Sequence, residues 1–481
     1  MKLANRKWTR EEFSEKRKEV LSWWPTGQEV DLDEAVEYHK QLPEAKVFAK
    51  KLDKCRGEGI VPIQVGLGHA TVEETQAHIQ LVEENGVDLA WVQIDTYSRR
   101  RQYDKAQRGI EESMRTGVSV LNGYPYVNHG HKSMRKIVDA MRVPLLLEAS
   151  SDEESMLSAE IGFAGGGTAN LCQDLRQLLA HSKNYPLDRR IQNMQYNSRL
   201  AAYYTERGAP IEGLVSGMIH GYVPSGMGSA IAILQCLLVA EQGMKHISFM
   251  TASLYNLLFD VANMRVCRKL AAEYLQRFGY NDVRVLIVPW PWEGGWPPDS
   301  ERASAVAAWQ STISMLGGAD WIHLRSVHEG IGIPTPQANI ASIKIGGQIR
   351  RMLSGQRLPD SSELQLETQM LEQEVRSIVD KVLELGDGDP AVGEVKAVEA
   401  GVLDCAITPW IHCHGDVLAV RDTSGVLRYV EHGNVPLPKE VIDYHKKKIC
   451  EREQREHRKA GIEMAIHDFH ALSRHNLEPR K

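Results

Sequence analysis

Eight apolar runs rich in β-branched residues recur along this chain, and segments with helical periodicity separate most of them. We expect strands at residues 60–65, 88–94, 118–121, 143–147, 214–218, 246–250, 283–288 and 321–324. Residues 72–84 and 304–316 carry apolar side chains at the spacing of a helix that buries one face. Nearly continuous apolar strands are buried on both faces, and eight of them alternating with helices make a closed parallel barrel. The sequence therefore predicts the α/β class and a (β/α)8 TIM barrel.

The length of 481 residues leaves room for segments on either side of such a barrel. We expect a helical N-terminal extension over residues 1–55, the barrel over 56–358, and a C-terminal α+β extension over 359–481. The last part begins with an apolar-periodic helix at 361–385 and ends, after Pro436, in a charged segment typical of a solvated helix. The interval 148–213 is long for one connection, so we expect two helices and the glycine-rich turn GFAGGGTAN as an insertion there.

Charge and hydropathy argue against several classes of protein. The net charge is −6 with acids and bases mixed throughout, which predicts neither a nucleic-acid-binding surface nor a membrane-binding patch. No apolar run reaches the ~18 residues that span a bilayer, and the N-terminus lacks the apolar core of a secretory signal. Seven scattered cysteines, an odd number, are typical of reduced thiols, so we expect a cytoplasmic protein.

The loops after the last two predicted strands are the strongest candidates for a functional site. They read PWPWEGGWPPD and RSVHEGIGIPTPQAN, and the second carries Arg325, His328 and Glu329 in quick succession. Loops at the C-terminal ends of barrel strands are where this fold places its chemistry. Arg325 and Glu329 are also four residues apart, which permits an ordinary ion pair if the segment is helical.

These loops, with WPTGQEVDLDEAVEYHK near the N-terminus and VRDTSGVLRYVEHGNVP near the C-terminus, resemble the epsilon subunit of glutamate mutase (methylaspartate mutase). The resemblance runs from Trp8 to about Asn434. It implies an isomerase that uses adenosylcobalamin for a radical 1,2-rearrangement of L-glutamate to 3-methylaspartate. It also implies a homodimer of this chain and a small cobalamin-binding sigma-type subunit that carries D-x-H-x-x-G. The segment HDFHALSRH has the D-x-H spacing but no following glycine, so we expect the cobalt ligand from that separate subunit.

The resemblance also assigns a set of cofactor-facing residues. They are Gly68, Asn122, Ala180, Trp296, Arg325, Glu329 and Ile333. The family has a proline at Ala180 and a lysine at Arg325, and an arginine keeps the charge but replaces a point donor with a planar fork. Taken without the resemblance, Gly68 at the end of the first strand either lets a flat cofactor approach the backbone or relieves a tight turn. Asn122, just past the third predicted strand, is equally suited to a turn.

The residues implied for substrate binding depart from the family pattern. They are Tyr97, Arg99, Gly66, Glu148, Leu171, Gln177 and His181. Arg99 in IDTYSR matches one of three family arginines that hold carboxylates, and Gly66 and Glu148 stand in place of the other two. Leu171, Gln177 and His181 replace acidic and tyrosyl residues. A substrate carboxylate ~4 Å from Glu148 would meet a repulsion of about 4 kcal/mol at an effective dielectric of ~20.

We therefore expect glutamate or a related amino or carboxylic acid, with one carboxylate held by Arg99 and a cationic group or masked acid at Glu148. Other cations provide an alternative way to hold glutamate: His69, Arg100, Arg101, His129, His131 and Arg176 are near in sequence. We assign no residue a catalytic role. The cluster HCHGD lacks zinc spacing, so no metal site is predicted. Two other hypotheses remain: a cobalamin-independent barrel lyase using Glu329 and His328, and a non-catalytic partner subunit.

Overall fold

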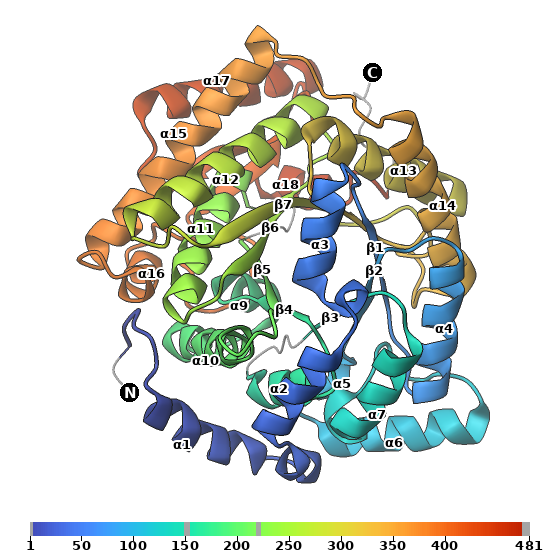
Figure 1. Ribbon diagram of the computed structural model, residues 1–481. Helices are drawn as coiled ribbons and strands as arrows, with labels where there is room; N and C mark the ends of the chain where they lie inside the picture. Colours follow the sequence, from blue (N-terminus) through green and yellow to red (C-terminus); the bar gives the residue numbers. More distant parts are fainter. Residues whose placement is uncertain (1–2, 149–153, 218–222, 474–481) are drawn as a thin grey trace.

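The computed structural model describes residues 3–148, 154–217 and 223–473. Its described part contains one eight-stranded parallel sheet in the order β7-β6-β5-β4-β3-β2-β1-β8 (Figure 1). The strands are β1 (Ile63–Leu67), β2 (Leu89–Val92), β3 (Leu145–Leu147), β4 (Ala169–Cys172), β5 (Glu212–Ser216), β6 (His246–Ala252), β7 (Arg284–Trp290) and β8 (Ile322–Leu324). The backbone N–H of Asp320 donates to the carbonyl of Ile287 at 2.9 Å, and the Asp320 carboxylate accepts from the Ile287 N–H at 2.7 Å. These bonds join β7 to β8, so the sheet is a nearly closed TIM-like barrel.

Alternate residues of the strands fill the barrel interior, as the two-residue period of a strand requires. Leu286, Val288 and Trp290 of β7 all point into one buried cluster with side chains from other strands. Phe48 and Leu52 of α3 (Phe48–Gly57) belong to the same cluster, and the Phe48 ring lies 6.0 Å from that of Trp321. Because Trp321 directly precedes β8, α3 closes the N-terminal end of the barrel and leaves the C-terminal end as its mouth.

Helices surround the sheet, and shorter ones lie in its connecting loops (Figure 1). Those around the barrel are α4 (Val72–Glu84), α6 (Tyr103–Thr116), α7 (Tyr126–Ala140), α8 (Met156–Ala164), α10 (Leu187–Thr205), α11 (Ser225–Glu241), α12 (Leu257–Arg277), α13 (Ser300–Gly317) and α14 (Pro336–Met352). The short ones are α5 (Thr96–Arg99) and α9 (Leu175–His181). Before α3 lie α1 (Arg10–Leu21), η1 (Pro25–Glu29), α2 (Leu32–Gln41) and η2 (Glu44–Lys46). The alternation of strand and helix confirms the predicted fold class.

One of the eight predicted strands is wrong, and one real strand was missed. The segment 118–121 is an irregular connection after α6, and its Val118 and Val120 are 64% and 50% exposed. An isolated bridge between Ile94 and Tyr124 links this connection to the segment after β2. The missing strand is β4, which begins within the segment GFAGGGTAN. The interval 148–213 is therefore not an insertion of two helices, because it holds a strand of the barrel between α8 and the helices α9 and α10. Met218, the last residue of the fifth predicted strand, lies outside the described residues.

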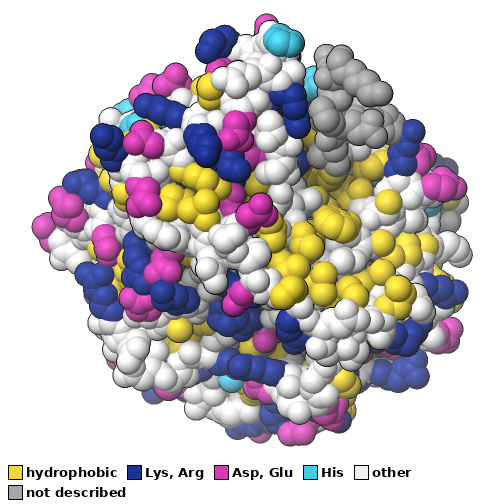
Figure 2. Space-filling model, turned by 90° about the horizontal axis from the view of Figure 1, so that it is seen from above, with side chains coloured by type: hydrophobic (Ala, Val, Ile, Leu, Met, Phe, Trp, Pro, Cys, Tyr) yellow, Lys and Arg dark blue, Asp and Glu magenta, His cyan; other side chains and the backbone are white. Residues whose placement is uncertain are grey.

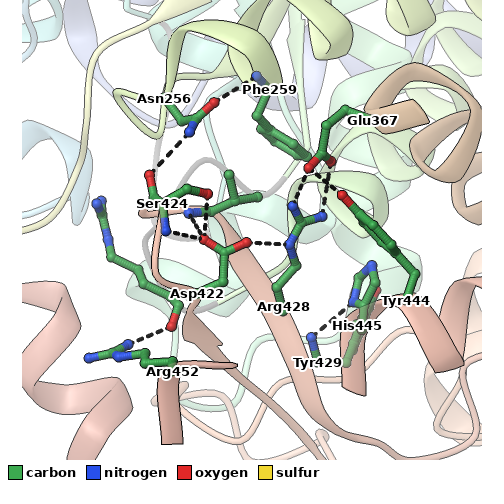
Figure 3. Close-up of polar contacts among 12 residues, drawn as sticks. Asn256, Phe259, Glu367, Asp422, Ser424, Arg428, Tyr429, Tyr444, His445 and Arg452 are labelled. Carbon is green, nitrogen blue, oxygen red and sulfur yellow. Dashed lines mark hydrogen bonds and ion pairs between the residues drawn. The ribbon is translucent and has the colours of Figure 1, made fainter. Parts of the chain in front are cut away.

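The C-terminal region adds a second layer on one side of the barrel. It comprises α15 (Ser362–Leu385), α16 (Pro390–Glu399), the antiparallel pair β9 (Val417–Arg421) and β10 (Leu427–His432), α17 (Lys439–Glu456) and α18 (Ile462–Phe469). In Figure 3 the Arg428 guanidinium donates to Asp422 at 2.8 Å and to Glu367 of α15 at 2.5 Å. The Asn256 side chain donates to the Ser424 carbonyl at 3.1 Å. These bonds fix the β9–β10 pair against the helices that cover the barrel.

The charged tail after Pro436 is not a solvated helix, as the sequence suggested. Val441, His445, Ile449 and Arg452 of α17 are all buried. Their spacing of three to four residues places them on one face of the helix, and α17 packs with that face on β10 and α15. The helix is therefore part of the packed structure, with most of its charged side chains on the outer side and Arg452 buried in a pair with Asp468.

Candidate active site at the mouth of the barrel

A cavity of about 260 Å³ opens at the C-terminal ends of the strands. Trp91 of β2, Leu171 of β4 and Trp290 of β7 form its walls. The loop after β7 adds Trp292 and Trp296, and the Trp296 indole N–H donates to the Trp292 carbonyl at 2.7 Å. An amino acid-sized space with aromatic walls therefore lies where this fold places its chemistry.

Three arginines and three glutamates line the cavity among the described residues, and they are paired with one another. Arg99 after β2 contacts Glu148 after β3 at 3.0 Å. The Glu293 carboxylate bridges two guanidinium groups, at 2.7 Å from Arg176 of α9 and 2.9 Å from Arg325 after β8. Arg325 also contacts Glu329 at 2.6 Å. Positive and negative charges in this set therefore balance before any ligand enters.

Burial makes these pairings strong determinants of the local geometry. The Arg176 and Glu293 side chains are only 9% and 10% exposed. Burial alone would lower the pKa of Arg325, but Glu329 and Glu293 outweigh it and raise that pKa above its ordinary value. The guanidinium thus stays charged inside the protein, and its two carboxylates hold it in place.

A neutral histidine lies beneath the aromatic wall. The His323 ring stacks on Trp290 with centroids 3.9 Å apart and an interplanar angle of 3°, and its Nδ1 lies 2.9 Å from the Gln64 amide oxygen. Burial, and after it the charge of Arg325, lowers the pKa of His323 well below its ordinary value. The Trp91 ring lies 5.2 Å from that of His323, and its indole N–H finds no acceptor among the described residues. A ligand acceptor in the cavity would satisfy that buried donor.

The structure brings together most, but not all, of the residues predicted from the sequence. Those that line the cavity are Arg99, Glu148, Leu171, His181, Trp296, Arg325 and Glu329. Gln177 lies one layer behind, where its amide oxygen accepts from Arg176 at 3.1 Å. Gly66 lies behind Trp91, and a β-carbon there would meet the Trp91 ring at 3.1 Å. Of the alternative cations, Arg176 lines the cavity, whereas Arg101 pairs with Glu154 outside it.

The other predicted residues lie away from this cavity. Tyr97 and Ile333 are 39% and 42% exposed in loops at the mouth. Asn122 hydrogen-bonds Thr96, and it follows the irregular segment after α6 rather than a third strand. Likewise Glu148 follows the third strand, β3, not the fourth. A β-carbon at Gly68 would lie 2.9 Å from the Gln93 carbonyl oxygen and 3.2 Å from the Gly123 Cα, so close backbone packing alone requires a glycine there.

Ala180 lies in a second cavity, of about 640 Å³, that adjoins the first. The two share His181 and Glu293, and Ile462, Ile466 and Phe469 of α18 line the second. The Gly295 N–H donates to the Phe469 carbonyl at 2.9 Å, so α18 supports the loop that carries Glu293. The C-terminal segment therefore forms one wall of the mouth.

Sequence reasoning missed Glu293, Trp91 and Trp290. Glu293 belongs to the loop PWPWEGGWPPD that was singled out, but its partner Arg176 is 117 residues away and no local pattern links them. His328, proposed as the base of a lyase, does not line the cavity. The described residues contain no group of three or more metal-ligating side chains of His, Cys, Asp or Glu. His412 and His414 of HCHGD contact Asn184 and the Glu399 carbonyl separately.

Comparison with known proteins decides the family. The profile of the family described as "Methylaspartate mutase E chain (MutE)" matches residues 42–481. The chain belongs to this family. The glutamate mutase epsilon subunit of Desulfitobacterium hafniense (strain Y51) is 37% identical over 482 residues, which cover 100% of this chain and 99% of the relative. The corresponding subunit of Treponema denticola is 35% identical and covers 98% of both chains. That of Haloarcula marismortui is 32% identical and covers 94% of this chain and 91% of the relative.

Two further findings complete the comparison. The tryptophan synthase α subunit of Legionella pneumophila str. Paris covers 63% of this chain at 13% identity with a TM-score of 0.32, too distant to bear on function. Within the residues that the structure describes, no helix has the length and apolar character needed to cross a membrane.

Proposed function

We propose that this chain is the epsilon-type barrel subunit of an adenosylcobalamin-dependent carbon-skeleton mutase. It acts on L-glutamate or a related amino or carboxylic acid, as a homodimer, together with a small sigma-type subunit that carries the cobalamin-binding D-x-H-x-x-G motif. The observation that carries this proposal is the aromatic cavity at the barrel mouth with its arginine–glutamate pairs, in a chain that belongs to the epsilon-subunit family.

Residues at the mouth are suited to a flat corrin ring with apolar edges. Ile333 and Tyr97 present exposed apolar surface there, and the Arg325 Nε–H has no partner among the described residues. With Trp296 and Glu329, these residues would hold the cofactor. Adenosylcobalamin supplies, when bound, a carbon radical that abstracts hydrogen from the substrate.

The chain's own residues bind and orient the substrate and exclude water. Arg99 lines the cavity, and a guanidinium can hold a carboxylate through paired N–H donors, which would fix a substrate in one orientation. The Trp91 and Trp290 rings and the neutral His323 give the wall no proton-donating acid next to the reacting carbons. The loop held by α18 lines the cavity, and a corrin over the mouth would seal it.

Exposed apolar surface supports the proposed partner subunit. Figure 2 shows a broad patch of hydrophobic side chains on one face of the molecule, bordered by charged ones. Several large apolar side chains are also highly exposed in the described part of the chain, among them Met114 at 72% and Ile331 at 60%. Contiguous exposed apolar surface marks interaction sites more often than scattered residues do, which supports assembly with a second subunit.

Cofactor retention tests the proposal. Adenosylcobalamin is mixed with this chain, with a sigma-type glutamate mutase subunit, or with both, and cobalamin absorbance is followed through gel filtration. We expect co-elution with this chain only when both proteins are present, and at least tenfold weaker retention for Arg325→Ala. Arg265→Ala, which breaks an exposed pair with Asp360, is the control and should retain the cofactor fully. No retention in the two-protein mixture would overturn the proposal and favour the cobalamin-independent lyase.

A further inference from the structure

One end of the cavity, lined by Arg99 and Glu148, is suited to a zwitterion. Arg99 and Glu148 both line it, their charged groups are 3.0 Å apart, and they come from neighbouring strands β2 and β3. An α-amino acid carries its carboxylate and ammonium on the same carbon, so the two groups match an arginine and a glutamate that lie side by side. Leu171, which also lines the cavity, is apolar, so Glu148 is the acid that faces the substrate beside Arg99.

Among the described residues, the arginines at the opposite end are already paired with carboxylates, so a second substrate carboxylate would add a negative charge to a balanced set. Arg176 and Arg325 face Glu293, and Arg325 faces Glu329 as well. The charges of these two guanidinium groups and two carboxylates therefore cancel one another within the described residues. A substrate carboxylate placed here would have to displace a resident one, and Glu293 is held by the Trp290 indole N–H at 2.8 Å in addition to its two arginines.

Between these two ends the wall is aromatic. A β-carbon at Gly66 would lie only 3.1 Å from the Trp91 ring, so the indole packs against the glycine. Trp91 and Trp290 lie with ring centroids 5.4 Å apart, and Trp290 continues into the stacked His323. This part of the wall is therefore apolar and carries no charge of its own.

We infer that the substrate is an α-amino acid with a single carboxylate and an uncharged, apolar side chain. Arg99 binds the carboxylate, Glu148 binds the ammonium group, and the side chain lies along Trp91 and Trp290. The volume of about 260 Å³ is below the ~300–1,000 Å³ of usual ligand pockets, which limits the substrate to one amino acid of about leucine or phenylalanine size. This inference rests on the proposed function, because it names the substrate of that same site.

Binding of matched acids by the complex with cofactor and sigma-type subunit tests the inference. Calorimetry would compare L-leucine, L-phenylalanine and L-glutamate with 4-methylpentanoate and 3-phenylpropionate, which lack the ammonium group. We expect leucine or phenylalanine to bind at least tenfold more tightly than glutamate and at least tenfold more tightly than its own des-amino analogue. Tighter binding of glutamate, or equal binding of the des-amino acids, would overturn the inference.

Variants separate recognition from folding. Glu148→Gln should abolish the preference for the amino acid over its des-amino analogue, a ratio measured within one preparation. Glu154→Gln, the same change at the pair with Arg101 outside the cavity, should keep that ratio. An unchanged ratio in Glu148→Gln contradicts the assigned role. If the complex retains the cofactor but prefers glutamate, this inference is wrong and the proposed function stands. If the complex does not retain the cofactor, the proposed function is wrong, and binding of the amino acids to this chain alone then decides the inference.

Discussion

The carboxylate of Glu293 is the most informative single group to remove. It lies 2.7 Å from the guanidinium of Arg176 and 2.9 Å from that of Arg325, and all three side chains are at most 16% exposed. Glu293→Gln keeps the shape and the acceptor for Trp290 but leaves Arg176 without its glutamate partner. Removing one member of a buried ion pair costs about 3–5 kcal/mol, because the remaining charge stays desolvated.

This loss of stability can be measured as a decrease in the melting temperature, Tm. An unfolding entropy of about 2.1 cal/mol/K per residue gives about 1 kcal/mol/K for 481 residues that unfold as one unit. We therefore expect calorimetry to show a Tm lower by about 3–5 °C, with little dependence on salt because the pair is buried. Glu384→Gln is the matched control: it removes an exposed partner of Lys381 and should shift Tm by less than about 1 °C.

A second readout follows from the same charge change. The variant cavity gains one positive charge, so a small dicarboxylate such as glutarate should raise its Tm more than that of the unsubstituted protein. If Glu293→Gln melts within 1 °C of the original chain and glutarate has no greater effect on it, then Glu293 does not compensate the two arginines, and the charge balance we describe is wrong.

Three further predictions concern the same structure. Burial lowers the pKa of His39 to about 4, so between pH 6.5 and 5 it is mainly the unfolded chain that gains a proton at this residue, and the free energy of unfolding decreases as the pH is lowered. The free energy of unfolding of His39→Gln, measured by denaturation, should therefore decrease by about 2 kcal/mol less than that of the unsubstituted protein over this interval. Gly294→Ala places a β-carbon against the Phe469 carbonyl oxygen and should lower the free energy of unfolding by about 1–3 kcal/mol. Gly347→Ala in α14 meets nothing within 4 Å and should raise it by about 0.5–1 kcal/mol. Thermal melts in which both variants shift Tm in the same direction would contradict this packing. Asp468→Asn weakens the hydrogen bonds from Arg452, at 2.6 and 2.8 Å, that hold α18. Because α18 supports the loop after β7, hydrogen exchange of the amides in residues 290–296 should become faster. Unchanged exchange in these residues would show that α18 does not stabilise the loop.

The fold was predictable where hydrophobic periodicity is strong. The helix predicted at 72–84 has the same bounds as α4, and six of the predicted strands other than 118–121 overlap real ones over most of their described length. The segment VSVL at 118–121 alternates like a strand, yet its valines are exposed because the segment is an irregular connection after α6 and does not join the sheet. The strand β4 was missed because ANLC is short and contains the polar Asn170, which lies buried all the same.

The site was predictable in part for a related reason. Resemblance to a family placed Arg99, Arg325 and Glu329, and each lines the cavity. The pairing of Arg176 with Glu293 joins a helix after β4 to a loop after β7, and such a contact depends on barrel closure rather than on any local pattern. The buried face of α17 was not predicted because it includes His445 and Arg452, and polar side chains such as these are usually expected to be exposed.

Electron paramagnetic resonance of the complete complex tests the central claim most directly. This chain, a sigma-type subunit and adenosylcobalamin are combined, and spectra are recorded after adding L-leucine, L-phenylalanine or L-glutamate. We predict a substrate-dependent radical signal that Arg99→Ala abolishes while cofactor retention persists. Retained cofactor with no signal from any amino acid would contradict the assignment of this cavity as the site of a radical mutase.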